Sequence, residues 1–153
     1  MKIGIVGLGL IGGSLALDWR SHGHSILGVA RRETTVQQAL AKGMVNEAST
    51  ELSILTAAEV IVLCTPISEL QPTVEALIPH IRPSTILTDV GSVKAEVVTA
   101  IAPLWRNFVG GHPMAGKAES GLEVAEARLF QGKPYVLTPT PDTPDTVVET
   151  VAE

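Results

Sequence analysis

The chain has 153 residues, of which 45% are hydrophobic and 18% charged, a composition that indicates one globular domain and excludes a largely disordered chain. The formal net charge is −5 and the largest basic cluster is Arg31-Arg32, so we expect no nucleic-acid partner. The single cysteine, Cys64, excludes an internal disulfide and a multi-cysteine metal site, and we expect no metal. Without a signal peptide or a long apolar run, we expect a soluble cytoplasmic protein with no membrane partner.

The first fourteen residues carry the pattern on which the rest of the chain depends. A β-branched run at 3–6 predicts a buried strand, and Gly7, Gly9 and Gly12 follow in G-x-G-x-x-G spacing before an amphipathic helix at 10–22. Gly7 allows a tight turn, Gly9 lets the backbone approach a pyrophosphate, and Gly12 lets the helix pack close to the strand. The first helical amides point at the phosphates, with the positive end of the helix dipole behind them. The predicted cofactor contacts of this loop are Gly7, Gly9, Leu10, Ile11 and Gly12.

Strands and helices alternate along the rest of the chain. Further strands are predicted at 25–30, 60–64, 86–90, 107–111 and 135–138. Helices are predicted at 34–41, around 51–55, and at 68–77, 94–102 and 122–130, with a last one beginning near Pro144. This alternation predicts a doubly wound, mostly parallel α/β sheet with right-handed crossovers, a Rossmann-type dinucleotide-binding domain over residues 1–153.

The end of the second predicted strand distinguishes the two nicotinamide dinucleotides. A site for NAD places Asp or Glu about 20 residues beyond the glycines, where it holds the ribose hydroxyls. Here the sequence reads Ala30-Arg31-Arg32. A carboxylate repels a 2′-phosphate, whereas Arg31 and Arg32 can bind it through charge-assisted hydrogen bonds. The alternative is two solvated arginines that open a helix, a poor position for cations. We therefore predict NADP as the cofactor.

Residues at the ends of the next two strands extend the predicted cofactor site. Thr65 can contact a ribose or phosphate, and Pro66 can pack against a flat ring. A purely structural role in ending the strand explains both residues equally well. Cys64 has no basic neighbour in sequence and is interpreted as a packing residue rather than a nucleophile. We count Cys64, Thr65 and Pro66, with Gly91 after the following strand, among the predicted cofactor contacts.

His112 is the candidate base. Two glycines precede it and Pro113 follows, and the segment is expected to leave a strand at the ligand edge, where a histidine can accept a proton near neutral pH. Ser92 can bond a ligand, orient His112 or cap the helix at 94–102. Lys94 can attract an anionic substrate or lie on a solvated helix face. The other histidines are interpreted as two turn residues and one residue at a helix end: His22, His24 and His80.

Three segments together resemble the prephenate/arogenate dehydrogenase family of tyrosine biosynthesis. They are Gly7-Leu8-Gly9-Leu10-Ile11-Gly12-Gly13-Ser14-Leu15-Ala16, Asp89-Val90-Gly91-Ser92-Val93-Lys94 and Gly110-Gly111-His112-Pro113-Met114-Ala115-Gly116. In that family a nicotinamide cofactor oxidises a cyclohexadienol while a carboxylate leaves as CO2. The resemblance implies that His112 takes the proton of the ring hydroxyl and that Ser92 helps to position that hydroxyl and the imidazole. It implies no metal.

The same resemblance implies a two-domain enzyme. A C-terminal helical domain, absent from these 153 residues, would supply basic substrate-binding residues and the homodimer contact, so the chain alone need not be active. We expect an NADP-dependent arogenate or prephenate dehydrogenase; the sequence leaves the choice of substrate, feedback by tyrosine and the oligomeric state open. Two alternatives share the glycine loop: a β-hydroxyacid dehydrogenase, and an NADP-sensing module without catalysis.

Overall fold

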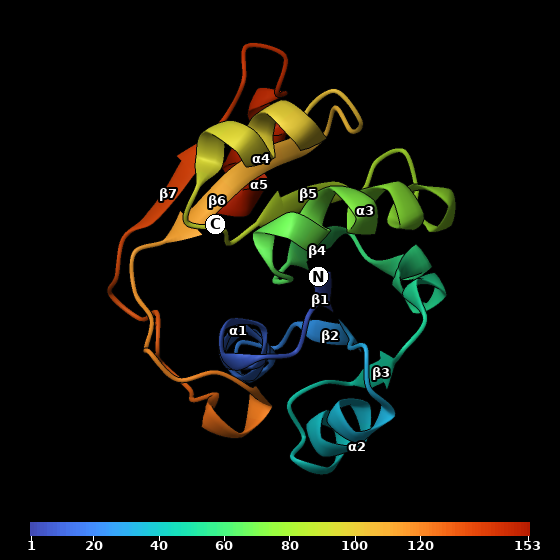
Figure 1. Cartoon of the computed structure of the whole chain (residues 1–153), viewed down its shortest axis with the longest axis vertical. Coiled ribbons are helices and arrows are strands. Elements are labelled where there is room, and N and C mark those ends of the chain that lie inside the picture. Colours follow the sequence, from blue (N-terminus) through green and yellow to red (C-terminus); the bar gives the residue numbers. More distant parts are fainter.

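A seven-stranded sheet organises the computed structural model, which describes all of residues 1–153 (Figure 1). Six strands are parallel, and the last is antiparallel to its neighbour. The predicted doubly wound, mostly parallel sheet is therefore confirmed. In spatial order the strands are β3 (Glu47–Ser49), β2 (Ser25–Val29), β1 (Lys2–Val6), β4 (Val60–Leu63), β5 (Ile86–Asp89), β6 (Phe108–Pro113) and β7 (Tyr135–Thr138).

Helices cover both faces of the sheet and enclose two separate cores (Figure 1). Helices α1 (Leu10–Ser21) and α2 (Glu33–Ala41) pack on one face, and α3 (Ile67–Leu77) and α4 (Lys94–Ile101) pack on the other. A last helix, α5 (Asp145–Ala152), lies against β6. Short 3-10 helices span Leu52–Ala57, Ile78–His80 and Leu122–Val124.

Strand β4 shows why the central strands are apolar throughout. Val60 and Val62 belong to the core beneath α1, whereas Ile61 and Leu63 belong to the core beneath α3 and α4. Successive side chains of a strand point to opposite faces, so a strand covered on both faces needs an unbroken apolar run. The central strands therefore lie buried between the two helical layers, and the candidate site residues follow at the strand ends.

The predicted helix at 122–130 is wrong. Only Leu122–Val124 is helical, as one 3-10 turn, and Arg128 has a positive φ of 66°. Side chains of α1 take the amides that a helix would have paired: Ser14 Oγ accepts from the Glu126 amide at 3.0 Å, and Asp18 Oδ1 accepts from the Arg128 amide at 2.8 Å. Packing against α1 thus overrides the local helical pattern.

Smaller differences lie between β2 and β4. The strand β3 was not predicted, and the helix expected around 51–55 is the 3-10 helix Leu52–Ala57. A three-residue strand gives too short a pattern to be recognised from sequence. No helix of the chain has both the length and the apolar character needed to cross a bilayer.

Candidate functional site

The strand register places all the predicted site residues along one edge of the sheet. Val29 pairs with Val6, Val6 with Leu63, and Leu63 with Asp89, so β2, β1, β4 and β5 end side by side. Strand β6 runs beyond the end of β5, because Thr88 pairs with Val109 and β6 continues to Pro113. The segments that follow these strands therefore share the carboxyl edge, where open α/β sheets bind ligands.

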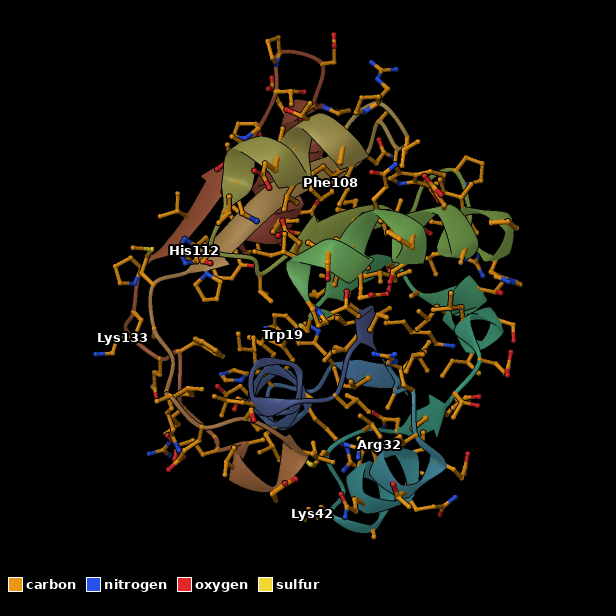
Figure 2. The ribbon with its side chains drawn as sticks, in the orientation of Figure 1. Trp19, Arg32, Lys42, Phe108, His112 and Lys133 are labelled. Carbon is orange, nitrogen blue, oxygen red and sulfur yellow. The ribbon has the colours of Figure 1, made fainter.

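The order along this edge is itself informative. From β2 to β6 it carries the arginine pair, the glycine loop, Thr65, the Gly91-Ser92 turn and finally His112. The connectivity reverses at β1, next to β4, which is the position where such sheets open a crevice. In Figure 2, Arg32 and His112 lie on opposite sides of α1, which is seen end-on. An elongated ligand laid along the edge would have one end at Arg32 and the other near His112.

The glycine loop has the geometry expected of a phosphate-binding turn. Gly7 has a φ of 98°, and a Cβ there would lie 2.7 Å from the carbonyl oxygen of Cys64. A Cβ on Gly12 would overlap the carbonyl oxygen of Gly7, whereas the space beside Gly9 is open. No side chain caps the start of α1, so the amides of Leu10 and its neighbours are free to bind an anion.

A cavity of about 970 Å3 lies between the carboxyl ends of β2, β1 and β4. Gly7 and Gly9 line its floor, and Arg31 and Arg32 line the side next to α2. Both arginines are exposed, and neither forms an ion pair or a side-chain hydrogen bond within the chain. Ala30 is buried where a ribose-binding acid would stand, so this part of the wall presents two free guanidinium groups and no carboxylate.

The opposite wall comes from the end of β4. Thr65 and Pro66 line the cavity, and Thr65 Oγ1 is buried without any hydrogen-bond partner. A buried hydroxyl without a partner is costly, so its position beside a cavity indicates a polar ligand group. Cys64 also lines the cavity, and burial raises the pKa of its thiol, with Asp89 as a second cause. A neutral thiol packed against the core fits the packing interpretation and not a nucleophile.

His112 lies within β6, not after it. It is the fifth residue of the strand, pairs with Val136 of β7 and is partly exposed. Ser92 is exposed on the turn between β5 and α4, and the structure has no hydrogen bond between it and His112. The capping interpretation of Ser92 is wrong, because the N-cap of α4 is Val93 and no side chain caps this helix. Neither His112 nor Ser92 lines the cavity described above.

A buried ion pair that was not predicted from the sequence binds the residues before Ser92 and His112. The side chain of Asp89 is fully buried, and it binds the ammonium of Lys94, which is 14% exposed. The interpretation of Lys94 as a residue on a solvated helix face is therefore wrong, because its ammonium is largely buried against Asp89. Its attraction for an anionic substrate stays a prediction. Burial lowers the pKa of Lys94, while the hydrogen bond and charge of Asp89 oppose that shift. The five-residue spacing between Asp89 and Lys94 across a strand end and a turn gave no signal in sequence.

The fold and the edge together define a class of protein. A glycine turn at a free helix N-terminus, a cavity at the strand reversal, and an unsatisfied Thr65 hydroxyl fit a dinucleotide, so the chain is a dinucleotide-binding domain. His112 at the far end supplies a group that can exchange protons. No three His, Cys, Asp or Glu side chains are grouped as metal ligands.

Comparison with known proteins gives the family. Residues 15–153 match the family model described as "Prephenate dehydrogenase, nucleotide-binding domain", and the chain belongs to this family. It is 36% identical over 152 residues to prephenate dehydrogenase of Bacillus subtilis, covering 95% of this chain and 41% of that protein. The region matched by the family model starts at Leu15, just after the glycine loop.

Two solved structures are similar over nearly the whole chain. The arogenate dehydrogenase of Synechocystis has 49% identity and a TM-score of 0.97, covering 99% of this chain and 55% of that one. Prephenate dehydrogenase of Aquifex aeolicus, in complex with hydroxyphenyl propionate and NAD+, has 30% identity and a TM-score of 0.94, with the same two coverages. The chain thus spans about half the length of these relatives.

Proposed function

We propose that residues 1–153 form the nucleotide-binding domain of an NADP-dependent arogenate or prephenate dehydrogenase. A helical domain outside these residues would complete the substrate site and form a homodimer contact. The observation that carries the proposal is the order of groups along one sheet edge: free arginines at β2, the glycine loop at β1, and a partly exposed histidine at β6. This order supports a dinucleotide lying along the edge with its reactive end towards His112.

The choice of NADP rests on the wall formed by Arg31 and Arg32. These guanidinium groups have no partner in the chain, and the residue that directly follows Val29 at the end of β2 is Ala30 rather than an acid. Planar guanidinium groups bind phosphate oxygens in pairs, and they lose less hydration than an ammonium does. A 2′-phosphate would provide the missing counter-charge. The NAD+ bound in the Aquifex aeolicus structure belongs to that protein, and the arginine pair is our reason for expecting NADP here.

In the proposed reaction the cofactor accepts a hydride from the substrate and the protein accepts a proton. When bound, the nicotinamide ring supplies the acceptor for a hydride. His112 accepts the proton of the ring hydroxyl, and Ser92, on the adjacent turn, holds that hydroxyl in line with the imidazole. Loss of the ring carboxylate as CO2 leaves a phenolate, which takes the proton back from the His112 imidazolium to become a phenol, and the gain in aromatic stability drives the reaction. The protein's tasks are therefore to orient the substrate, to remove one proton and to exclude water.

The proposed site residues do not distinguish arogenate from prephenate. Arogenate carries an amino group where prephenate carries a keto group, and His112 and Ser92 act on the ring rather than on that group. The similarity to the Synechocystis arogenate dehydrogenase supports arogenate as the first substrate to test.

The test is an initial-rate assay of the full-length enzyme, meaning the polypeptide that contains residues 1–153. Arogenate, prephenate and 3-hydroxyisobutyrate are each paired with NADP+ and with NAD+. We expect turnover of arogenate or prephenate, with a higher kcat/KM for NADP+. Turnover of 3-hydroxyisobutyrate alone would identify a β-hydroxyacid dehydrogenase. Tight NADP+ binding without turnover of any substrate would identify a sensing module, and either result would overturn the proposal.

A further inference from the structure

Strand β6 extends past the end of β5 and loses its neighbour there. Strand β5 ends at Asp89, after which the chain turns away into α4, while β6 continues through Gly111 and His112. On the side that faces β5, the amide and carbonyl of Gly111 thus have no backbone partner. Buried peptide groups without partners are destabilising, and a strand end held on one side only is free to shift. Something must hold this end of β6.

The side chains of Asp89 and Lys94 replace the missing backbone of β5. Asp89 Oδ1 accepts a hydrogen bond from the Gly111 amide at 3.1 Å, and Lys94 Nζ donates to the Gly111 carbonyl at 2.7 Å. Carboxylate and ammonium also bind each other. The amide and the carbonyl of Gly111, the residue before His112, are therefore both held by one ion pair.

The same carboxylate holds the neighbouring turn. Asp89 Oδ2 accepts a hydrogen bond from the Gly91 amide at 2.8 Å, and Gly91 directly precedes Ser92. One buried side chain thus binds the residue before Ser92 with one oxygen and the residue before His112 with the other. The distance between the two proposed functional residues depends on a single rigid group.

Tyr135 closes the arrangement from β7. Its hydroxyl donates to the backbone carbonyl of Asp89 at 3.0 Å, and a Cβ on Gly111 would lie 2.5 Å from that hydroxyl oxygen. The close fit leaves no room for a side chain at Gly111. Movement of the Asp89 carboxylate is therefore limited by groups from β5, α4, β6 and β7 together.

We infer that Asp89 and Lys94 form a positioning pair that sets the placement of His112 relative to Ser92. This inference rests on the proposed function, because it takes His112 and Ser92 as the residues that act on the substrate. The pair itself is assigned no contact with substrate or cofactor. Its effect on the reaction passes through the two glycines alone. A carboxamide at position 89 has only one accepting atom, so it cannot hold both glycine amides, and it leaves the Lys94 charge buried without a counter-charge.

The test compares Asp89→Asn, Lys94→Met and the double variant Asp89→Asn/Lys94→Met in the full-length enzyme. Glu59→Gln is the matched control, since the Glu59 carboxylate also accepts a backbone amide, that of Lys2, but at the opposite edge of the sheet. We expect Asp89→Asn to lower kcat by about 100-fold, the size of effect that a displacement of about 1 Å can have. The KM for the dinucleotide should stay at its wild-type value, and Glu59→Gln should keep the wild-type kcat.

The double variant separates positioning from simple stabilisation. Removing both charges relieves the buried unpaired ammonium, so Tm should recover while kcat stays low, because the two glycine amides still lack a common acceptor. Recovery of both Tm and kcat would overturn the inference. If Asp89→Asn alone does not fold, the double variant decides the question.

Hydrogen exchange on the 153-residue protein gives an independent measurement. In Asp89→Asn the amide of Gly91 or Gly111 should exchange about tenfold faster or more, as expected for a lost hydrogen bond to a carboxylate. Unchanged exchange at both glycines would contradict the inference. His112→Asn is assayed in parallel: wild-type turnover in that variant overturns the proposed function and the positioning role with it. Loss of turnover there, with a normal kcat in Asp89→Asn, overturns only the positioning role.

Discussion

Gly12 lies directly against the carbonyl oxygen of Gly7, and this contact fixes how closely α1 follows β1. A Cβ at position 12 would overlap that oxygen, which is backbone and cannot move aside. We expect Gly12→Ala to lower the free energy of unfolding by about 3 kcal/mol, the upper range for overpacking. Denaturant unfolding of the 153-residue protein measures the loss.

Gly9→Ala is the matched control for this prediction. The space beside Gly9 is empty, so the alanine variant should keep the wild-type stability. It should nevertheless bind the dinucleotide more weakly, because the methyl group projects from the start of α1 where the pyrophosphate is expected. Equal losses of stability in the two variants would show that this reading of the loop is wrong.

The cofactor preference can be measured on the 153-residue protein itself. We expect it to bind NADP+ more tightly than NAD+, and Arg31→Ala/Arg32→Ala to remove most of the difference while leaving NAD+ binding intact. A charge-assisted hydrogen bond contributes about 1.5–3 kcal/mol, or roughly ten- to a hundred-fold in affinity. Calorimetric titration with both dinucleotides measures it. Arg106→Ala is the control, since Arg106 is exposed on the loop before β6. A wild-type preference for NAD+ would contradict the prediction.

Replacing His112 should separate catalysis from cofactor binding. In the full-length enzyme, His112→Asn should lower kcat/KM by about 10²–10⁴-fold, the usual contribution of a general base. The dissociation constant for NADP+ should not change, because the imidazole acts on substrate. His80→Asn is the control: His80 is exposed before β5, at the other edge of the sheet. A low kcat/KM in both variants would mean that the loss is not specific to His112.

Stability should fall in alkaline solution. Burial raises the pKa of Cys64 above its ordinary 9.0 and that of Tyr135 above its ordinary 10.0. Above these ordinary values the unfolded chain loses protons that the folded chain keeps, so the free energy of unfolding decreases as pH rises. Lys94, whose pKa burial lowers, acts in the opposite sense below pH 10.5.

The Cys64 contribution can be isolated by Cys64→Ala. Under reducing conditions, the pH dependence of denaturant unfolding above pH 9 should be shallower in this variant than in the wild type, by up to about one proton. A variant whose stability follows the same curve as the wild type would show that the thiol ionises equally in both states.

The sequence alone determined the sheet and its edge. Unbroken apolar runs such as 60–63 are required of strands covered on both faces, and the G-x-G-x-x-G spacing of Gly7, Gly9 and Gly12 falls within one βα turn, where Gly12 lies against the Gly7 carbonyl. These constraints act on residues that are close in sequence, so they produce recognisable sequence patterns. The doubly wound sheet, and the end of each strand where the candidate residues lie, followed from them.

Only the tertiary structure decided what those residues touch. The amides at 126 and 128 are taken by Ser14 and Asp18, more than a hundred positions earlier, which replaces the helix that the local pattern predicted. The Gly111 amide donates to Asp89, twenty-two positions earlier, because β6 extends beyond the end of β5. Strand lengths in a sheet are set by packing rather than by local pattern. Contacts between distant segments follow no sequence periodicity, so the pair that binds Gly111, next to His112, became visible only in the folded chain.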